Sequence, residues 1–248
     1  MTLDPTRRFS ARVEDYIRHR PSYPPQVLDL LERECGLHPG AVVADLGCGT
    51  GILAALFLAR GCEVYGVEPN PEMRDAGSRL LAAEPHFHSV EGRAEATTLP
   101  GRSVDLISAG QAFHWFDPAA AAIEARRILK PGGWVALVWN ERRHQTGFMS
   151  EYEALIARYA TETPRVNQAN LERFFAGAQW RSAPFDNYQQ MDASGLRGRL
   201  ASSSYAPLPG SPEFQVLAVE LDKLFTRHQR DGLVTIVYDT DVYYGSWG

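Results

Sequence analysis

Three closely spaced glycines provide the clearest chemical signal in this chain. Gly47, Gly49 and Gly51 follow an apolar run at 42–46 that contains one acid, Asp45, and they precede a helix-like stretch. Glycine adopts positive φ and lets a ligand approach the backbone closely, because it has no Cβ. We therefore predict a nucleotide-binding turn between a strand and a helix, with peptide N–H groups facing the ligand.

The spacing of this turn argues against two common nucleotide sites. A dinucleotide-binding turn, G-x-G-x-x-G, would require glycine at Ile52, and a phosphate-binding loop requires a G-K-[ST] sequence that is missing here. A second acid, Glu68, ends the next predicted strand twenty-three residues after Asp45. An acid at about this distance can accept both hydroxyl groups of a ribose. The alternative is that Glu68, which precedes Pro69, caps the following helix.

A second group of candidate residues follows the predicted strand at 103–110. Histidine is suited to proton transfer near neutral pH, so His114 is the candidate base, although it could equally orient a carbonyl or line a pocket. The rings of Phe113 and Trp115 could form a wall of a pocket for a flat substrate and for a positively charged ligand. The alternative is that both rings fill the core.

Arginines are the candidates for binding an acidic group, because a guanidinium forms two parallel hydrogen bonds with a carboxylate. The candidates are Arg20, Arg142, Arg143, Arg197 and Arg199. Taken singly, most are also explained as solvated surface residues. If the reacting group of a substrate is a carboxylate, it would need such a clamp and no base, because it is already ionised. A hydroxyl or an acidic carbon would instead need a base to remove its proton.

Alternating strand and helix patterns place these residues on an α/β fold. The predicted strands lie at 42–46, 63–68, 87–91, 103–110, 134–139, 180–191 and 233–244. The predicted helices lie at 52–59, 71–83, 118–129 and near 150–160, 193–203 and 213–230. The segment 130–133, KPGG, is predicted to separate the helix at 118–129 from the next strand. We expect a three-layer, doubly wound, mostly parallel seven-stranded sheet whose last two strands are antiparallel partners.

A single domain over residues 1–248 accounts for the chain length. Within it we expect N-terminal lid helices at 1–36, a cofactor-binding core at 37–140, and substrate-side helices with closing strands at 141–248. Prolines 21, 24 and 25 would stiffen the lid.

Four segments together resemble the class I S-adenosylmethionine (SAM)-dependent methyltransferases. The acid and glycines of the turn are similar to the first motif of that family, and the segment 91–100, EGRAEATTLP, looks like its adenine-binding motif. The segments 111–118, QAFHWFDP, and 16–24, YIRHRPSYP, are similar to a small-molecule, methyltransferase type 11-like subgroup related to trans-aconitate methyltransferase. The resemblance covers residues 9 to 140 and is loose beyond them.

The resemblance implies SAM as cofactor, with S-adenosylhomocysteine as product. In such enzymes the acid at Asp45 faces the methionine amino group, Ala94 addresses the adenine ring edge and Glu95 accepts from its exocyclic amine. The implied cofactor-binding residues are Asp45, Gly47, Cys48, Gly49, Gly51, Glu68, Pro69, Met73, Ala94, Glu95, Gln111, Tyr16 and Arg20. The implied substrate-binding residues are Phe113, His114, Trp115, Tyr23 and Arg142.

We therefore expect methyl transfer to a small molecule, at a carboxylate or hydroxyl oxygen. The alternatives are C- or N-methylation, a non-methylating SAM-dependent reaction, or a non-catalytic SAM-binding partner protein, because a fold does not specify its chemistry.

Composition narrows the partners and the compartment. Twenty-five basic and thirty acidic residues give a net charge of −5, so no global positive field would attract nucleic acid. No apolar run reaches the ~18 residues of a membrane span, and the first residues lack the apolar core of a secretory signal. Three cysteines without a C-x-x-C pair indicate no disulfide framework and no metal site. We expect a cytoplasmic monomer or homodimer with no nucleic-acid or membrane partner.

Overall fold

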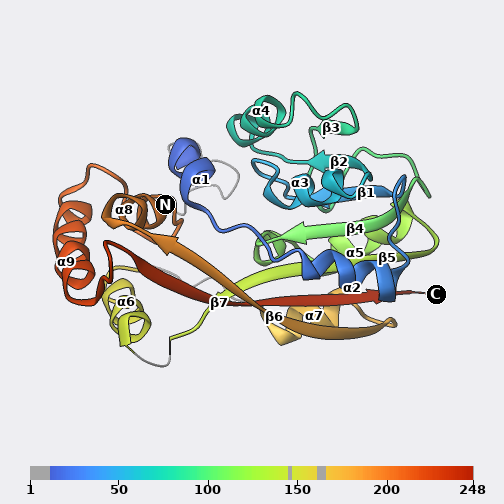
Figure 1. Ribbon diagram of the computed structural model, residues 1–248. Coiled ribbons are helices and arrows are strands. Elements are labelled where there is room, and N and C mark those ends of the chain that lie inside the picture. Colours follow the sequence, from blue (N-terminus) through green and yellow to red (C-terminus); the bar gives the residue numbers. More distant parts are fainter. Residues whose placement is uncertain (1–11, 145–146, 161–165, 248) are drawn as a thin grey trace.

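A seven-stranded sheet forms the centre of the computed structural model, which describes residues 12–144, 147–160 and 166–247 (Figure 1). Its strand order is β3-β2-β1-β4-β5-β7-β6. The strands are β1 (Val42–Leu46), β2 (Glu63–Val67), β3 (Phe87–Val90), β4 (Val104–Gly110), β5 (Leu129–Arg142), β6 (Gln179–Met191) and β7 (Val234–Ser246). The first five strands pair in parallel, and β7 pairs antiparallel with both β5 and β6. The predicted doubly wound, mostly parallel sheet is confirmed.

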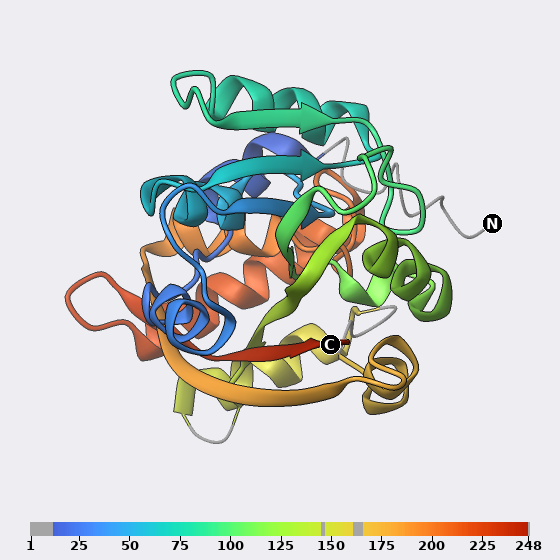
Figure 2. The same ribbon diagram turned by 90° about the vertical axis from the view of Figure 1, so that its right-hand side faces the viewer.

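Helices cover both faces of the sheet. Apolar residues of α2 (Gln26–Cys35) and α3 (Ile52–Ala59) form one core with one side of the strands. On the other side, α5 (Pro118–Ile128) and α7 (Gln168–Phe174) form a second core. In Figure 2 the blue helices α2 and α3 and the green helix α5 lie on opposite sides of the strands. Another helix, α4 (Pro71–Leu80), packs beside β3.

The long strands β5, β6 and β7 extend beyond strands β1 to β4 and carry a third helical group (Figure 1). This group consists of α6 (Gly147–Ala157), α8 (Ala193–Ala201) and α9 (Pro212–His228), with a core of its own against the ends of β6 and β7. The helices predicted near 150–160, 193–203 and 213–230 are therefore confirmed.

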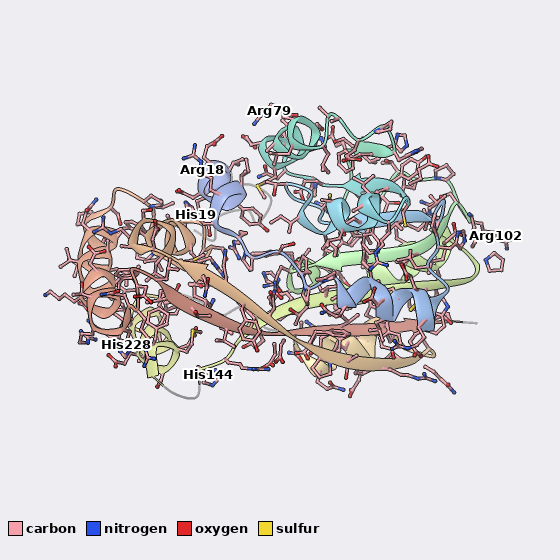
Figure 3. The ribbon with its side chains drawn as sticks, viewed as in Figure 1. Arg18, His19, Arg79, Arg102, His144 and His228 are labelled. Carbon is pink, nitrogen blue, oxygen red and sulfur yellow. The ribbon has the colours of Figure 1, made fainter. Side chains whose placement is uncertain are left out.

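The N-terminal helix α1 (Val13–His19) lies between the third helical group and α4. It packs against α8 and contacts α4. Figure 3 shows Arg18 and His19 on α1 and Arg79 on the neighbouring α4. The first eleven residues of the predicted lid lie outside the described residues. Among the helices of the described part of the chain, none is long and apolar enough to cross a membrane.

Two predicted boundaries are wrong. The segment 130–133 does not separate a helix from a strand, because β5 already begins at Leu129, which pairs with Val104. The register then shifts before Trp134 pairs with Leu106, so the glycines form an irregularity within the strand. The helix α4 ends at Leu80 instead of Ala83, where the chain turns towards β3.

Candidate active site

The predicted glycine turn connects the carboxyl end of β1 to α3 and lines a large cavity. Gly47 and Gly49 border this cofactor cavity, which has a volume of about 570 Å³. Gly47 has a φ of +65°, and a Cβ there would lie 2.6 Å from Cβ of Ala112. Only glycine can therefore occupy this position without moving the turn that follows β4.

The backbone N–H groups of the turn do not face the cavity, so this part of the prediction is wrong. The N–H groups of Gly47 and Cys48 donate to the Val67 carbonyl at 2.9 and 3.1 Å. The N–H of Gly49 donates to Glu68 at 2.8 Å, and that of Gly51 donates to the Cys48 carbonyl. These bonds hold the turn against β2. Gly51 is the N-cap of α3 and packs against Leu81 outside the cofactor cavity.

Asp45 lies at the end of β1 and is almost fully buried. Its Oδ1 accepts a hydrogen bond from the Ser108 hydroxyl at 2.8 Å, whereas its Oδ2 is buried without a hydrogen-bond partner. Burial raises the pKa of Asp45 to about 6, and the Ser108 hydroxyl and the neighbouring Cys48 thiol oppose that rise. A buried carboxylate oxygen without a partner is unfavourable, so this atom could accept from a cationic group. Asp45 borders a small space of about 20 Å³ and does not line the cofactor cavity itself.

Glu68 follows β2 and holds the glycine turn in place. Its two carboxylate oxygens accept from the N–H groups of Gly49 and Asn70 at 2.8 and 2.9 Å. The cap of α4 is Asn70, whose side chain accepts from the Met73 N–H, so Glu68 is not the cap. Burial raises the pKa of Glu68. Each oxygen retains a second lone pair, with which Glu68 can accept from a ligand hydroxyl.

The remaining wall of the cofactor cavity contains further predicted residues. Pro69, Met73, Ala94, Glu95 and Trp115 line it. Phe116 and Asp117, which sequence reasoning did not single out, line it as well. The Glu95 carboxylate accepts from the Asp117 N–H at 2.8 Å.

Tyr16 and Gln111 connect the cofactor cavity to a second, inner cavity of about 70 Å³, because both residues line both spaces. Gln111 has a φ of +55°, which is uncommon for a residue with a side chain. Its Oε1 accepts from the Asn140 N–H at 2.9 Å, and its Nε2 donates to the Asn140 carbonyl at 3.3 Å. The side-chain amide therefore continues the hydrogen bonding of β5 and stabilises this backbone conformation.

The inner cavity is lined by aromatic and cationic side chains. The His114 ring lies 4.3 Å from the Trp115 ring and 5.1 Å from the Trp139 ring, measured between centroids. Further lining residues are Arg20, Arg142, His144, Glu153, Arg199 and Tyr205. His114 and Arg142, two of the predicted substrate-binding residues, therefore line the same cavity.

The five candidate arginines divide by their partners. Arg143 pairs with Asp186 and Asp239, and Arg197 pairs with Asp222, so both are surface ion pairs and not clamps. Arg142 is bound to Glu153 and donates to the Tyr205 hydroxyl at 2.6 Å.

Arg20 and Arg199 line the inner cavity and form no ion pair with a carboxylate of the described residues. Arg20 stacks on the Tyr16 ring and donates to the Ser202 carbonyl at 2.8 Å.

Three predicted substrate-binding residues do not line the inner cavity. Trp115 lines the cofactor cavity, and Phe113 and Tyr23 line neither. Phe113 is buried in the core, with edge contacts to Phe116 and Phe174, so the alternative interpretation of this ring is correct. Tyr23 is buried beside α2. It lines a small space of about 20 Å³ together with Asp45 and Cys48, and not the inner cavity.

Sequence reasoning missed Asn140 and Tyr205. Asn140 directly follows the predicted strand 134–139, so a polar residue at the carboxyl end of a parallel strand was an available signal. It donates from Nδ2 to the Ser22 carbonyl at 3.3 Å and thereby connects β5 to the N-terminal segment. Tyr205 lies between α8 and α9, where no pattern indicated a site.

The strand order and the flanking helices are those of a Rossmann-like methyltransferase fold. The glycine turn after β1 and the acid after β2 border one cavity of this fold. A family model described as "Methyltransferase domain" matches residues 44–137. An uncharacterized methyltransferase of Mycobacterium bovis is 38% identical over 204 residues, which cover 82% of this chain and 79% of that protein. The chain therefore belongs to the methyltransferase family.

Solved structures share the fold. A candidate type II methyltransferase from Anaeromyxobacter dehalogenans superimposes with a TM-score of 0.67 at 24% identity, covering 92% of this chain and 98% of that chain. The phosphoethanolamine N-methyltransferase 2 of Haemonchus contortus, solved with S-adenosylhomocysteine, gives a TM-score of 0.57 at 18% identity. That match covers 98% of this chain and 58% of the other.

Proposed function

We propose that this protein is a SAM-dependent methyltransferase that methylates an oxygen atom of a small-molecule acceptor. The observation that carries the proposal is the unpartnered, buried Oδ2 of Asp45, which lies beside the glycine turn and next to the cofactor cavity. An α-ammonium group is a fitting partner for it, because the pair would compensate both buried charges.

The residues around the cofactor cavity fit the ribose and the adenine ring of SAM. Glu68 retains acceptor capacity for two ribose hydroxyls, and Gly47 and Gly49 leave room where a Cβ would intrude. Ala94 and Glu95 border the same cavity and are assigned to the adenine ring. The structural neighbour from Haemonchus contortus, solved with S-adenosylhomocysteine, supports the same choice of cofactor.

SAM, when bound, supplies a methyl group on a positively charged sulfur. The protein must then hold the accepting oxygen in line with the methyl group and exclude water. Tyr16 and Gln111 lie between the two cavities and would orient the groups that meet there. His114 would take a proton only from a neutral hydroxyl, since a carboxylate needs no base.

The first test is calorimetric titration of the protein with SAM and with S-adenosylhomocysteine. We expect micromolar binding of both, and loss of both in Asp45→Ala. Unchanged binding in Asp45→Ala, or no binding by the unmodified protein, would overturn the cofactor assignment.

His114→Ala separates the two oxygen chemistries. We expect cofactor binding to persist and turnover of a carboxylate acceptor to change by less than about tenfold. Complete loss of turnover with unchanged binding would instead indicate an acceptor that must be deprotonated. Release of S-adenosylhomocysteine in a screen of small acids and phenols would exclude a non-catalytic binding role.

A further inference from the structure

Arg199 is the most deeply buried cation of the inner cavity. The residue is 3% exposed, and its Nε and Nη1 donate to the Tyr238 hydroxyl at 3.3 Å and the Ser203 hydroxyl at 2.8 Å. Both partners are neutral groups, and no carboxylate of the described residues forms an ion pair with Arg199. Burying a cation without a counter-charge is costly, so this geometry favours an anionic ligand.

Arg20 adds a second uncompensated charge to the same space. Its Nε is buried without a hydrogen-bond partner. The positive potential of the cavity also acts on Tyr205: Arg142 and Arg199 lower the pKa of that phenol, although burial opposes the effect. Arg142 contributes less net charge than the other two, because Glu153 neutralises it.

The size of the inner cavity limits what the arginines can hold. A volume of about 70 Å³ accommodates a carboxylate and a few carbon atoms, and no more. The cofactor would fill the larger cavity on one side, beyond Tyr16 and Gln111. The remainder of an acceptor must therefore leave the inner cavity in another direction.

A groove along α6 provides that direction. Its volume is about 290 Å³, and it shares Arg142, His144, Glu153 and Tyr205 with the inner cavity, so the two spaces adjoin. All its other lining residues are apolar: Ala154, Ile156, Ala157 and Ala160. The groove thus offers an apolar surface to the remainder of an acceptor whose anionic group lies at the arginines.

We propose that the acceptor is an amphipathic monocarboxylate. Its carboxylate lies against Arg199 and Arg20, and its apolar chain lies in the groove along α6. This inference rests on the proposed function. An oxygen of the carboxylate would form the new O–CH3 bond with its own electron pair while the S–CH3 bond breaks and its pair stays on sulfur. No proton has to move, so the product is a methyl ester and a neutral thioether.

The unmodified protein provides the first experiment, which is calorimetric titration with four ligands in the absence of any cofactor. The ligands are octanoate, acetate, octan-1-ol and propane-1,2,3-tricarboxylate. A buried methylene contributes up to about fourfold in affinity, so we expect octanoate to bind at least tenfold more tightly than acetate. We also expect it to bind more tightly than the alcohol and the tricarboxylate. Equal affinity for octanoate and octan-1-ol, or tighter binding of the tricarboxylate, would overturn the proposal.

Variants then assign the two ends of the ligand. Arg199→Gln should weaken octanoate binding roughly 10- to 100-fold, the effect of losing a charge-assisted hydrogen bond. Its control is Arg197→Gln on the same helix, which removes only a surface ion pair and should bind octanoate normally. Ala157→Asp, at an exposed position of the groove, should abolish the advantage of octanoate over acetate and leave acetate binding intact. Normal octanoate binding in both Arg199→Gln and Ala157→Asp would contradict the inference.

Because Arg199 is buried, Arg199→Gln could lose the fold as well as the ligand. Arg199→Lys keeps the charge and should retain more octanoate affinity than Arg199→Gln, with circular dichroism confirming that both are folded. The octanoate experiments and the cofactor experiments can also fail independently of each other. Octanoate binding without formation of methyl octanoate would leave the anion site intact and reject methyl transfer to it, whereas binding of S-adenosylhomocysteine without octanoate binding would reject the anion site alone.

Discussion

Asp45 illustrates, at the scale of one residue, a conflict between stability and ligand binding. Its carboxylate is buried with one oxygen unpartnered, and its pKa is raised from 3.8 to about 6. The native state therefore binds a proton more tightly than the unfolded chain does. Between pH 4 and 6 the free energy of unfolding should fall as pH rises, by up to about 3 kcal/mol from this group. A cationic ligand group bound next to Asp45 would restore this part of the free energy of unfolding.

The first prediction concerns the stability of Asp45→Asn. The amide keeps the shape and the bond from Ser108 but removes the buried charge, so we expect a free energy of unfolding about 1 to 2 kcal/mol higher than that of the unmodified protein at pH 8. The difference should shrink as pH is lowered through 6 towards 4. Urea denaturation at several pH values measures it. A variant that is less stable at pH 8 would show that the charge is already compensated in the native state.

The second prediction concerns the pH dependence of cofactor binding. Protonated Asp45 cannot compensate an ammonium, so the affinity for S-adenosylhomocysteine should fall as pH drops below about 6, by up to about tenfold per pH unit. Calorimetric titration between pH 5 and 8 gives the profile. Asp45→Asn should bind weakly at every pH and show no such inflection, which serves as the control.

Much of the candidate site could be predicted at this scale, because acids and glycines at the carboxyl ends of neighbouring parallel strands meet in space. The hydrogen-bond partners of these residues could not be predicted. The N–H groups of the glycine turn donate to Val67, Glu68 and Cys48, and no local pattern reveals that use. The sequence also could not indicate which arginines form ion pairs, since the partner of Arg197 lies twenty-five residues away in the chain.

At the scale of secondary structure, the cofactor cavity depends on how two turns meet. One follows β1 and the other follows β4, and Gly47 faces Ala112 across them. The strands and long helices were predictable from their apolar periodicity. The helix α7 was missed because its seven residues carry only two buried positions, Leu171 and Phe174, too few for a periodic signal. The early start of β5 was missed because prolines and glycines usually interrupt a strand.

The third prediction compares two glycines with positive φ. Gly40 has a φ of +85°, and no neighbouring atom lies within 4 Å of the place that a Cβ would take, so Gly40→Ala should lose only about 1 kcal/mol to backbone strain. Gly47→Ala adds overlap with Ala112 and should lose about 2 to 4 kcal/mol together with S-adenosylhomocysteine binding. Urea denaturation and calorimetry measure the two effects.

The double variant Gly47→Ala, Ala112→Gly separates overlap from strain. It should recover stability to about the level of Gly40→Ala, because the contact between the two turns is relieved and only the strain remains. If the double variant is no more stable than Gly47→Ala alone, the contact between the turns is not what requires glycine.

At the scale of the whole molecule, the N-terminal helix joins the sheet to the third helical group. Tyr16 on α1 borders both cavities. The preceding Arg12 is buried and donates to the carbonyl of Ala201, the last residue of α8, and to those of Ser203 and Ala206 just after it. Asn187 on β6 donates to the Ser22 carbonyl at 2.8 Å. The segment that carries Tyr16 past both cavities is therefore held at both ends.

The last prediction tests this coupling. Arg12→Gln removes several charge-assisted hydrogen bonds, so we expect the opening free energy of α1 to fall by about 2 kcal/mol and amide hydrogen exchange at 13–19 to rise roughly 30-fold. Exchange in β1 and β4 should stay unchanged, and S-adenosylhomocysteine should bind more weakly because Tyr16 is no longer held over the cavity. Arg18→Gln is the control, since Arg18 is exposed on the same helix. Mass spectrometry of exchanged peptides measures all three regions, and equal exchange at 13–19 in the two variants would show that Arg12 does not hold the segment closed.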